Sequence, residues 1–220
     1  MSESKLDNEI KNLKLPLVNI RRTSNLAIAP INNFGMALGF FMLSVSLTKW
    51  CKFETPITSA VLIFGGVCEY ILGILDWYQG KTILCFIDFI FSFLHAFIYY
   101  CFKYQIDEGD NYKFESYLLG TFFVLYLVIL CCLTFICLEK GILYLACMGL
   151  LVFADIFVIV WQYRYKKGNG EDKHNKRIKK VAGYFLFFAS LAIWASGVGK
   201  FINEMFQQAY VPNFLLKPEI

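Results

Sequence analysis

Three polar side chains that could move protons follow one another along the third apolar run of the chain. Asp88, Ser92 and His95 stand at positions i, i+4 and i+7, which places them on one face of a helix. A carboxylate, a hydroxyl and an imidazole in a row can relay a proton, and imidazole titrates near neutral pH. Alternatively, this face packs into a helix bundle and the groups satisfy one another. We take Asp88 and His95 as candidate proton-coupling residues.

Ionisable residues also interrupt other apolar runs. Glu69 in the second run is the third proton-coupling candidate, and Asp155 lies in the fifth run. A carboxylate within a membrane is unfavourable unless it is paired, hydrated or functional. Lys200 and Glu204 form an i, i+4 pair near the end of the sixth run, which we interpret as structural or interfacial.

The composition indicates a membrane protein, and no cofactor is expected. Hydrophobic residues make up 58% of the chain and charged residues 17%, whereas soluble domains average about 45–50% and about 25%. The net charge of +4 is attributed to basic residues beside the membrane, so no nucleic-acid partner is expected. The eight cysteines and two histidines complete no zinc pattern, and buried reduced thiols are expected instead of disulfides.

Six apolar runs are long enough to cross a bilayer as helices. A spanning helix needs about 20 residues for a hydrocarbon core of about 30 Å. The runs are continuous, which excludes the alternating strands of a membrane barrel. We therefore predict an all-α polytopic bundle forming one domain. It has polar tails at 1–24 and 207–220, and spans at about 26–47, 57–76, 83–102, 117–138, 142–163 and 181–206.

Basic segments give conflicting evidence on orientation. The tail at 1–24 carries five basic residues, and the hydrophilic loop at 164–180 carries eight. The positive-inside rule would put both in the cytoplasm, but in a six-span protein they lie on opposite sides. We favour cytoplasmic termini. The tail lacks the apolar core of a signal peptide, and the plasma membrane is the expected location, with an internal membrane as the alternative.

Glycines in the first two spans predict close helix contacts. Gly35 and Gly39 form a GxxxG pair, and Gly66 and Gly73 lie seven residues apart on one face. A glycine without a Cβ lets another backbone approach. Together with Gly65, these are the five predicted packing positions.

Two amides stand close to the start of the first span. Asn32 and Asn33 follow Pro30, which is tolerated in the first turn of a helix. The asparagines either line the vestibule of a pore or lie at the level of the lipid headgroups.

Two motifs resemble the acetate uptake transporter family. The family has a Gly-Gly pair, a polar residue, a Gly, a Leu-Glu-Tyr-like end and a Gly-Asn-Thr turn in its second span. The sixth span of the family ends in Asn-Glu-x-Phe, followed by a proline. The corresponding residues here are Gly65-Gly66, Glu69, Gly73, Leu75-Asp76-Trp77, Gly80-Lys81-Thr82, Asn203-Glu204-Met205-Phe206 and Pro212. The resemblance covers about residues 26–214.

The sequence departs from the family at two other motifs. Only Ala29 and Pro30 survive from the opening Asn-Pro-Ala-Pro motif, and His95 stands where the third span of the family has a tryptophan. Alignment with the family places its narrow point on Met36, Phe91 and Leu150. Apolar side chains of this kind can close a pore by excluding water.

The resemblance implies a six-helix bundle with a pore through each protomer, assembled as a ring hexamer. It also implies proton-coupled transport of small monocarboxylates, namely acetate and possibly succinate. Amides of Asn32 and Asn33, and helix amides freed near Pro30, would then bind the substrate carboxylate. No enzyme motif is present, so catalysis is not expected.

Two other functions remain open. A dry pore lined by Phe91 and Leu150 would also suit a neutral solute such as ammonia or urea. The degraded opening motif is in turn compatible with a membrane scaffold or signalling protein that keeps the bundle without transport.

Overall fold

The computed structural model describes residues 31–50, 55–108, 116–137, 142–164 and 173–206. Within these ranges every regular element is a helix, which confirms the all-α prediction. Six helical stretches are long and apolar enough to cross a membrane. They are Ile31–Thr48, Pro56–Tyr78, Thr82–Cys101, Leu119–Cys137, Ile142–Arg164 and Lys173–Asn203. The predicted tails, Pro30 and the predicted turn at 139–141 lie outside the described residues.

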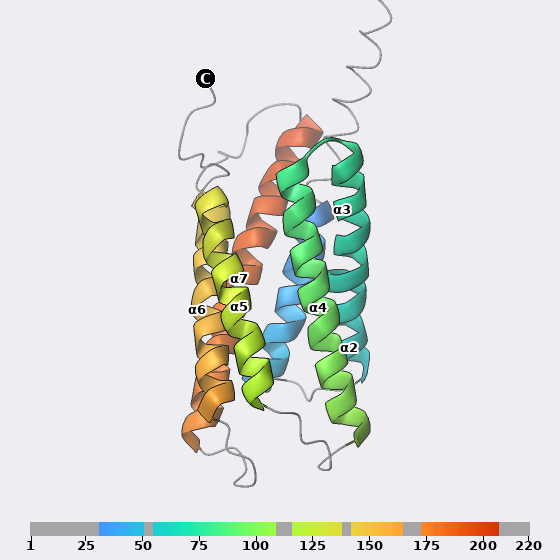
Figure 1. The fold of residues 1–220 in the computed structure, drawn as a ribbon. Coiled ribbons are helices and arrows are strands. Elements are labelled where there is room, and N and C mark those ends of the chain that lie inside the picture. Colours follow the sequence, from blue (N-terminus) through green and yellow to red (C-terminus); the bar gives the residue numbers. More distant parts are fainter. Residues whose placement is uncertain (1–30, 51–54, 109–115, 138–141, 165–172, 207–220) are drawn as a thin grey trace, which may run out of the picture.

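The first described helix, Ile31–Thr48, is called the central helix below because it runs through the middle of the bundle (Figure 1). Its span is 72% buried, against 28–44% for the other five spans. Burial on nearly all sides explains why a helix with two asparagines is held inside the protein: the other helices supply partners for polar side chains that lipid cannot.

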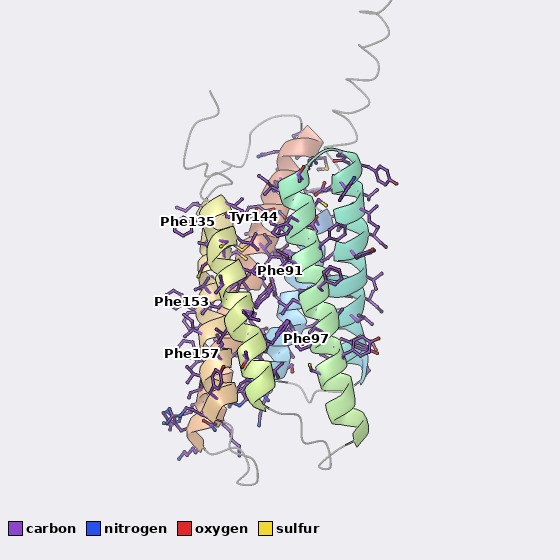
Figure 2. The ribbon with its side chains drawn as sticks, viewed as in Figure 1. Phe91, Phe97, Phe135, Tyr144, Phe153 and Phe157 are labelled. Atoms are coloured by element: carbon purple, nitrogen blue, oxygen red, sulfur yellow. The ribbon has the colours of Figure 1, made fainter. Side chains whose placement is uncertain are left out.

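The other helices surround the central helix. The second span consists of α2 (Thr55–Ala60), η1 (Val61–Cys68) and α3 (Glu69–Tyr78), which follow one another directly, and α4 (Thr82–Glu108) packs against η1 and α3. On the other side, α5 (Ser116–Cys137) packs on α6 (Ile142–Arg164), and α6 packs on α7 (Lys173–Phe206). Apolar side chains such as Phe135, which is 75% exposed, cover the outer surface (Figure 2).

The middle of the second span is a π-helix, which the sequence did not predict. In η1 the backbone hydrogen bonds join residues five apart, and such segments are frequent at functional sites. Gly65 and Gly66 lie within it. The hydroxyl of Ser92 on α4 donates a hydrogen bond of 2.8 Å to the carbonyl of Gly66, which ties this segment to the third span.

Helix α7 begins earlier than predicted. We placed residues 173–180 in a hydrophilic loop, but α7 has 34 residues and starts at Lys173. At 1.5 Å per residue it is about 51 Å long, well beyond the hydrocarbon core. The basic run keeps this segment out of the lipid. It does not prevent a helix, because Lys and Arg are good helix formers.

Candidate transport site

The two adjacent asparagines of the central helix face different neighbours. Asn32 Nδ2 donates to Asp88 Oδ1 on α4 at 2.7 Å, whereas Asn33 Oδ1 accepts a hydrogen bond from the Tyr144 hydroxyl on α6. Consecutive residues on a helix do not share a face. Asn33 is only 1% exposed and Asn32 is also buried. Both asparagines are therefore held by hydrogen bonds to other helices of the bundle.

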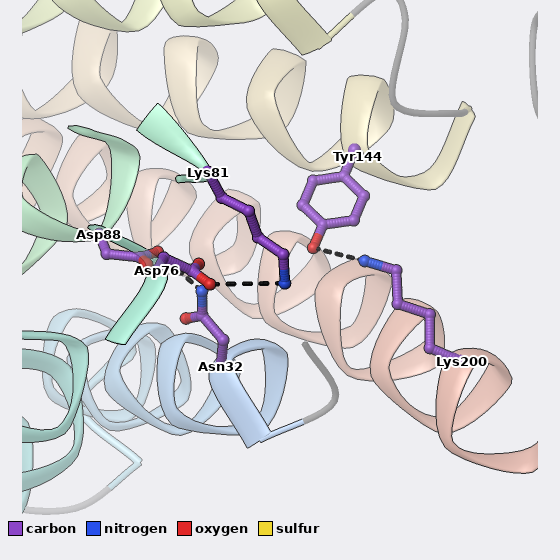
Figure 3. A network of polar contacts seen from close by, with 6 residues as sticks. All are labelled: Asn32, Asp76, Lys81, Asp88, Tyr144 and Lys200. Carbon is purple, nitrogen blue, oxygen red and sulfur yellow. Dashed lines mark hydrogen bonds and ion pairs between the residues drawn. The ribbon is translucent and has the colours of Figure 1, made fainter. Parts of the chain in front are cut away.

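Three carboxyl groups lie on the Asn32 side. We call Glu69, Asp76 and Asp88 the acidic cluster; all three are buried, and Figure 3 shows Asp76 beside Asp88. Lys81 Nζ lies 3.6 Å from Asp76 Oδ1. The turn after α3 positions this lysine: Gly80 has φ 72°, and the Lys81 amide donates to the Asp76 carbonyl at 2.9 Å.

Glu69 is fully buried, as is Asp88 of the same acidic cluster. The Glu69 side chain is 0% exposed, and neither of its carboxyl oxygens has a hydrogen-bond partner among the described residues. It fits against Gly35 of the central helix, where an added Cβ would lie 3.3 Å from Glu69 Oε1. Asp88 Oδ2 also lacks a hydrogen-bond partner in the described part of the chain. Such oxygens can take up or release protons without breaking a hydrogen bond.

A cation and a hydroxyl lie on the Asn33 side. We call Asn33, Tyr144, Ser196 and Lys200 the lysine–tyrosine cluster. Lys200 Nζ donates to the Tyr144 hydroxyl at 3.0 Å and lies 4.5 Å from the centroid of its ring. Asn33 Nδ2 is 3.5 Å from Ser196 Oγ, a long hydrogen bond.

Neither Lys200 nor Tyr144 is assigned to a site by the sequence. Lys200 was assigned to a pair with Glu204, whose side chain lies outside the described part of the structure. The basic charge within an apolar run was the available signal for Lys200. Nothing in the sequence distinguished Tyr144 from the other twelve tyrosines, since its partner at position 33 is 111 residues away.

His95 is enclosed by two glycines from neighbouring spans. An added Cβ at Gly39 would lie 2.7 Å from His95 Nε2, and one at Gly65 would lie 2.8 Å from Nδ1. The Cβ added at Gly39 would also lie 3.1 Å from the Gly65 Cα, so the two backbones approach closely here. His95 Nδ1 is 2.7 Å from the Phe91 carbonyl, which can only accept, so Nδ1 carries the proton of this bond.

The predicted polar face of α4 is buried, but its members bond to different elements. Asp88 contacts the central helix, Ser92 contacts η1, and His95 contacts its own helix. Among the described residues, no hydrogen bond joins two of these three side chains. A proton passing between them would therefore need intervening groups. Gly73 makes room for this helix, because an added Cβ would lie 3.3 Å from the Asp88 Cβ.

An aromatic layer lies in the middle of the bundle, and the His95 ring packs beside it. We define it as Phe40, Phe91 and Tyr126; the ring centroids of Phe40 and Phe91 are 5.4 Å apart, and those of Phe91 and Tyr126 are 6.4 Å apart. Figure 2 shows Phe91 in the interior, in contrast to Phe135 on the outside. Met36 is buried in the same core cluster. Leu150 is half-buried at the edge of that cluster.

A further acidic residue lies deeper along α6. Asp155 is buried two turns beyond Met148, and its Oδ2 has no hydrogen-bond partner within the described ranges. The same holds for the hydroxyl of Tyr126, which belongs to the aromatic layer. Polar atoms thus occur on α5 and α6 as well as around the two asparagines.

Comparison with known proteins gives a structural match only. No family model matches the chain, and no curated protein matches it in sequence. A solved structure described as that of the bacterial acetate channel SatP superimposes with a TM-score of 0.73. The chain has the fold of SatP. The match covers 84% of this chain and 97% of SatP, so the common fold includes nearly all of SatP.

The sequence identity to SatP is 15%, so the likeness establishes the fold and not the permeant. It confirms the fold that the family resemblance implied. Together with the six apolar helices, the SatP fold identifies an integral, multi-pass membrane protein.

Proposed function

We propose that the protein transports small monocarboxylates, above all acetate, across the membrane, coupled to protons. The observation that carries this proposal is the set of buried polar contacts at the start of the central helix. Asn32 donates to Asp88 of the acidic cluster, and Asn33 accepts from the Tyr144 hydroxyl, which in turn accepts from Lys200 (Figure 3). An anion needs a partner or a proton before it enters an apolar layer. The lysine–tyrosine cluster offers a partner for the anion, and the acidic cluster offers a proton. Both lie in a fold shared with SatP.

We infer the following roles for the individual residues. Asn32 and Asn33 bind the substrate, with backbone amides near Pro30 as further donors. Glu69, Asp88 and His95 are the proton-coupling groups. The gate consists of Met36, Phe91 and Leu150, which is the narrow point implied by the family resemblance. Succinate is a second substrate, and the protomers assemble as a ring hexamer, as in the family.

Uptake of labelled acetate into proteoliposomes tests the function, with and without an inward proton gradient. We expect accumulation above equilibrium with the gradient, and its loss on addition of a protonophore. Equilibration without accumulation would instead identify a passive channel. No acetate uptake by protein that elutes as a folded, monodisperse species would overturn the proposal, and ammonia and urea would then be the permeants to test.

Alanine at Phe91 is expected to open the aromatic layer. Phe91 is fully buried and contacts Phe40 and Tyr126 edge to face, so its loss leaves a gap that water can enter. Passive acetate equilibration should become several-fold faster, and accumulation under the gradient should fall. Phe135→Ala is the matched control, because that ring points outward. An unchanged passive rate in folded Phe91→Ala protein would exclude Phe91 from the gate.

A further inference from the structure

The lysine–tyrosine cluster contains the groups that recognise a carboxylate. Lys200 supplies an ammonium group, which donates to the Tyr144 hydroxyl. Asn33 accepts from that hydroxyl at Oδ1 and supplies an amide N–H on the Ser196 side. A carboxylate has two oxygens and accepts hydrogen bonds at both. Hydrogen bonds from a charged donor to a carboxylate are among the stronger ones in proteins.

The contacts of Lys200 direct its side chain into the bundle. Lysines near the ends of membrane helices commonly extend towards the headgroups. Here Nζ instead lies over the Tyr144 ring and bonds to its hydroxyl (Figure 3). Tyr144 is buried and Asn33 almost completely so. A cation in this position attracts an anion more strongly than a cation in water does, because the effective dielectric constant inside the protein is low.

The Asn33 amide can change partners at little cost. Its Nδ2 is 3.5 Å from Ser196 Oγ, at the limit of a hydrogen bond. An incoming carboxylate oxygen would replace this weak bond with a stronger one. The hydroxyl of Ser196 would remain beside the ligand as a further donor.

The cluster also lies close to the groups that the proposed function uses. Asn33 belongs to this cluster, and the residue before it, Asn32, bonds to Asp88 of the acidic cluster. Met36, one turn further along, leads to the aromatic layer. We propose that Lys200, Tyr144 and Asn33 form the carboxylate-binding site of the transporter, in which a small monocarboxylate is held by the ammonium and amide groups before it enters the layer. This inference rests on the proposed function.

Lys200→Gln and Tyr144→Phe test the site, with Lys179→Gln as the matched control. Lys179 is also on α7 and also lies over an α6 aromatic ring, at 4.6 Å from the Trp161 centroid, but near the other end of the helix. The KM for acetate uptake should rise about tenfold or more in Lys200→Gln, and less in Tyr144→Phe. In Lys179→Gln it should stay within twofold. A KM within twofold of the wild type in Lys200→Gln would overturn the inference and leave the function intact.

Direct binding separates failure of the site from failure of the function. Saturation-transfer NMR on the purified protein would compare acetate with acetamide, a neutral molecule of the same shape. We expect the wild type to prefer acetate and Lys200→Gln to lose that preference. If the wild type binds but does not transport acetate, the function fails and the site stands. Equal preference in wild type and variant overturns the site.

A lipid phosphate is the other anion that this lysine could bind. Uptake is therefore measured in vesicles of phosphatidylcholine alone and in vesicles that also contain phosphatidylglycerol. The effect of Lys200→Gln should be the same in both. An effect confined to the anionic vesicles would overturn the inference, because it would assign Lys200 to a headgroup.

Discussion

Alanine at Gly65 is expected to destabilise the bundle severely. The new Cβ would collide with the His95 ring, which cannot move away because Gly39 of the central helix lies on its other side. Overpacking of a tight core typically costs about 1–3 kcal/mol, and here the obstructing His95 ring is itself held against Gly39. Thermal unfolding in detergent, followed by intrinsic fluorescence, should show a lower midpoint and less monodisperse protein.

Gly149 provides the control for this substitution. A Cβ added there meets no atom within 4 Å, and alanine favours a helix over glycine by about 1 kcal/mol. Gly149→Ala should therefore be as stable as the wild type or more so. Removing the His95 ring should relieve the collision. The double variant Gly65→Ala, His95→Ala should therefore recover much of the stability that Gly65→Ala loses. Wild-type stability of Gly65→Ala alone would contradict the packing described here.

Glutamine at Glu69 is expected to uncouple acetate uptake from the proton gradient. The side chain keeps its size and still fits against Gly35, but it can no longer bind and release a proton. Accumulation of labelled acetate under an inward gradient should fall from several-fold to near equilibrium. Downhill equilibration should continue, because the aromatic layer is unchanged.

Asp155→Asn is the matched control for Glu69→Gln. It is also a buried acid on a spanning helix, and it belongs to α6 and not to the acidic cluster. This variant should still accumulate acetate under the gradient. Accumulation at the wild-type level in Glu69→Gln would exclude Glu69 as a coupling group and would leave Asp88 and His95.

The sequence alone predicted the features that depend on local pattern. Continuous apolar runs determine where spanning helices lie, because lipid offers the backbone no hydrogen-bond partners. The i, i+4, i+7 spacing correctly put Asp88, Ser92 and His95 on one buried face. The glycine spacing predicted close helix contacts without identifying the partner, and the structure brings Gly39 of the central helix against the Gly65 backbone.

Features that depend on distant partners could not be predicted in this way. The contact of Tyr144 with Asn33 and with Lys200 requires the packing of α6 and α7 against the central helix. The π-helix has no local signature beyond its glycine pair, which is equally compatible with an ordinary helix. The extension of α7 was missed because charge indicates exposure to water and does not indicate whether the backbone is helical.

If the proposed function holds, the aromatic layer also determines where a membrane voltage acts on the permeant. An applied potential falls mainly across the region of lowest dielectric constant, which is the zone filled by Phe40 and Phe91. Moving one elementary charge through 100 mV changes its free energy by about 2.3 kcal/mol. A bare acetate ion crossing this zone would carry electric current. Acetic acid formed beforehand beside the acidic cluster would cross without carrying current. The voltage dependence of flux therefore identifies the chemical form in which the solute passes Phe91.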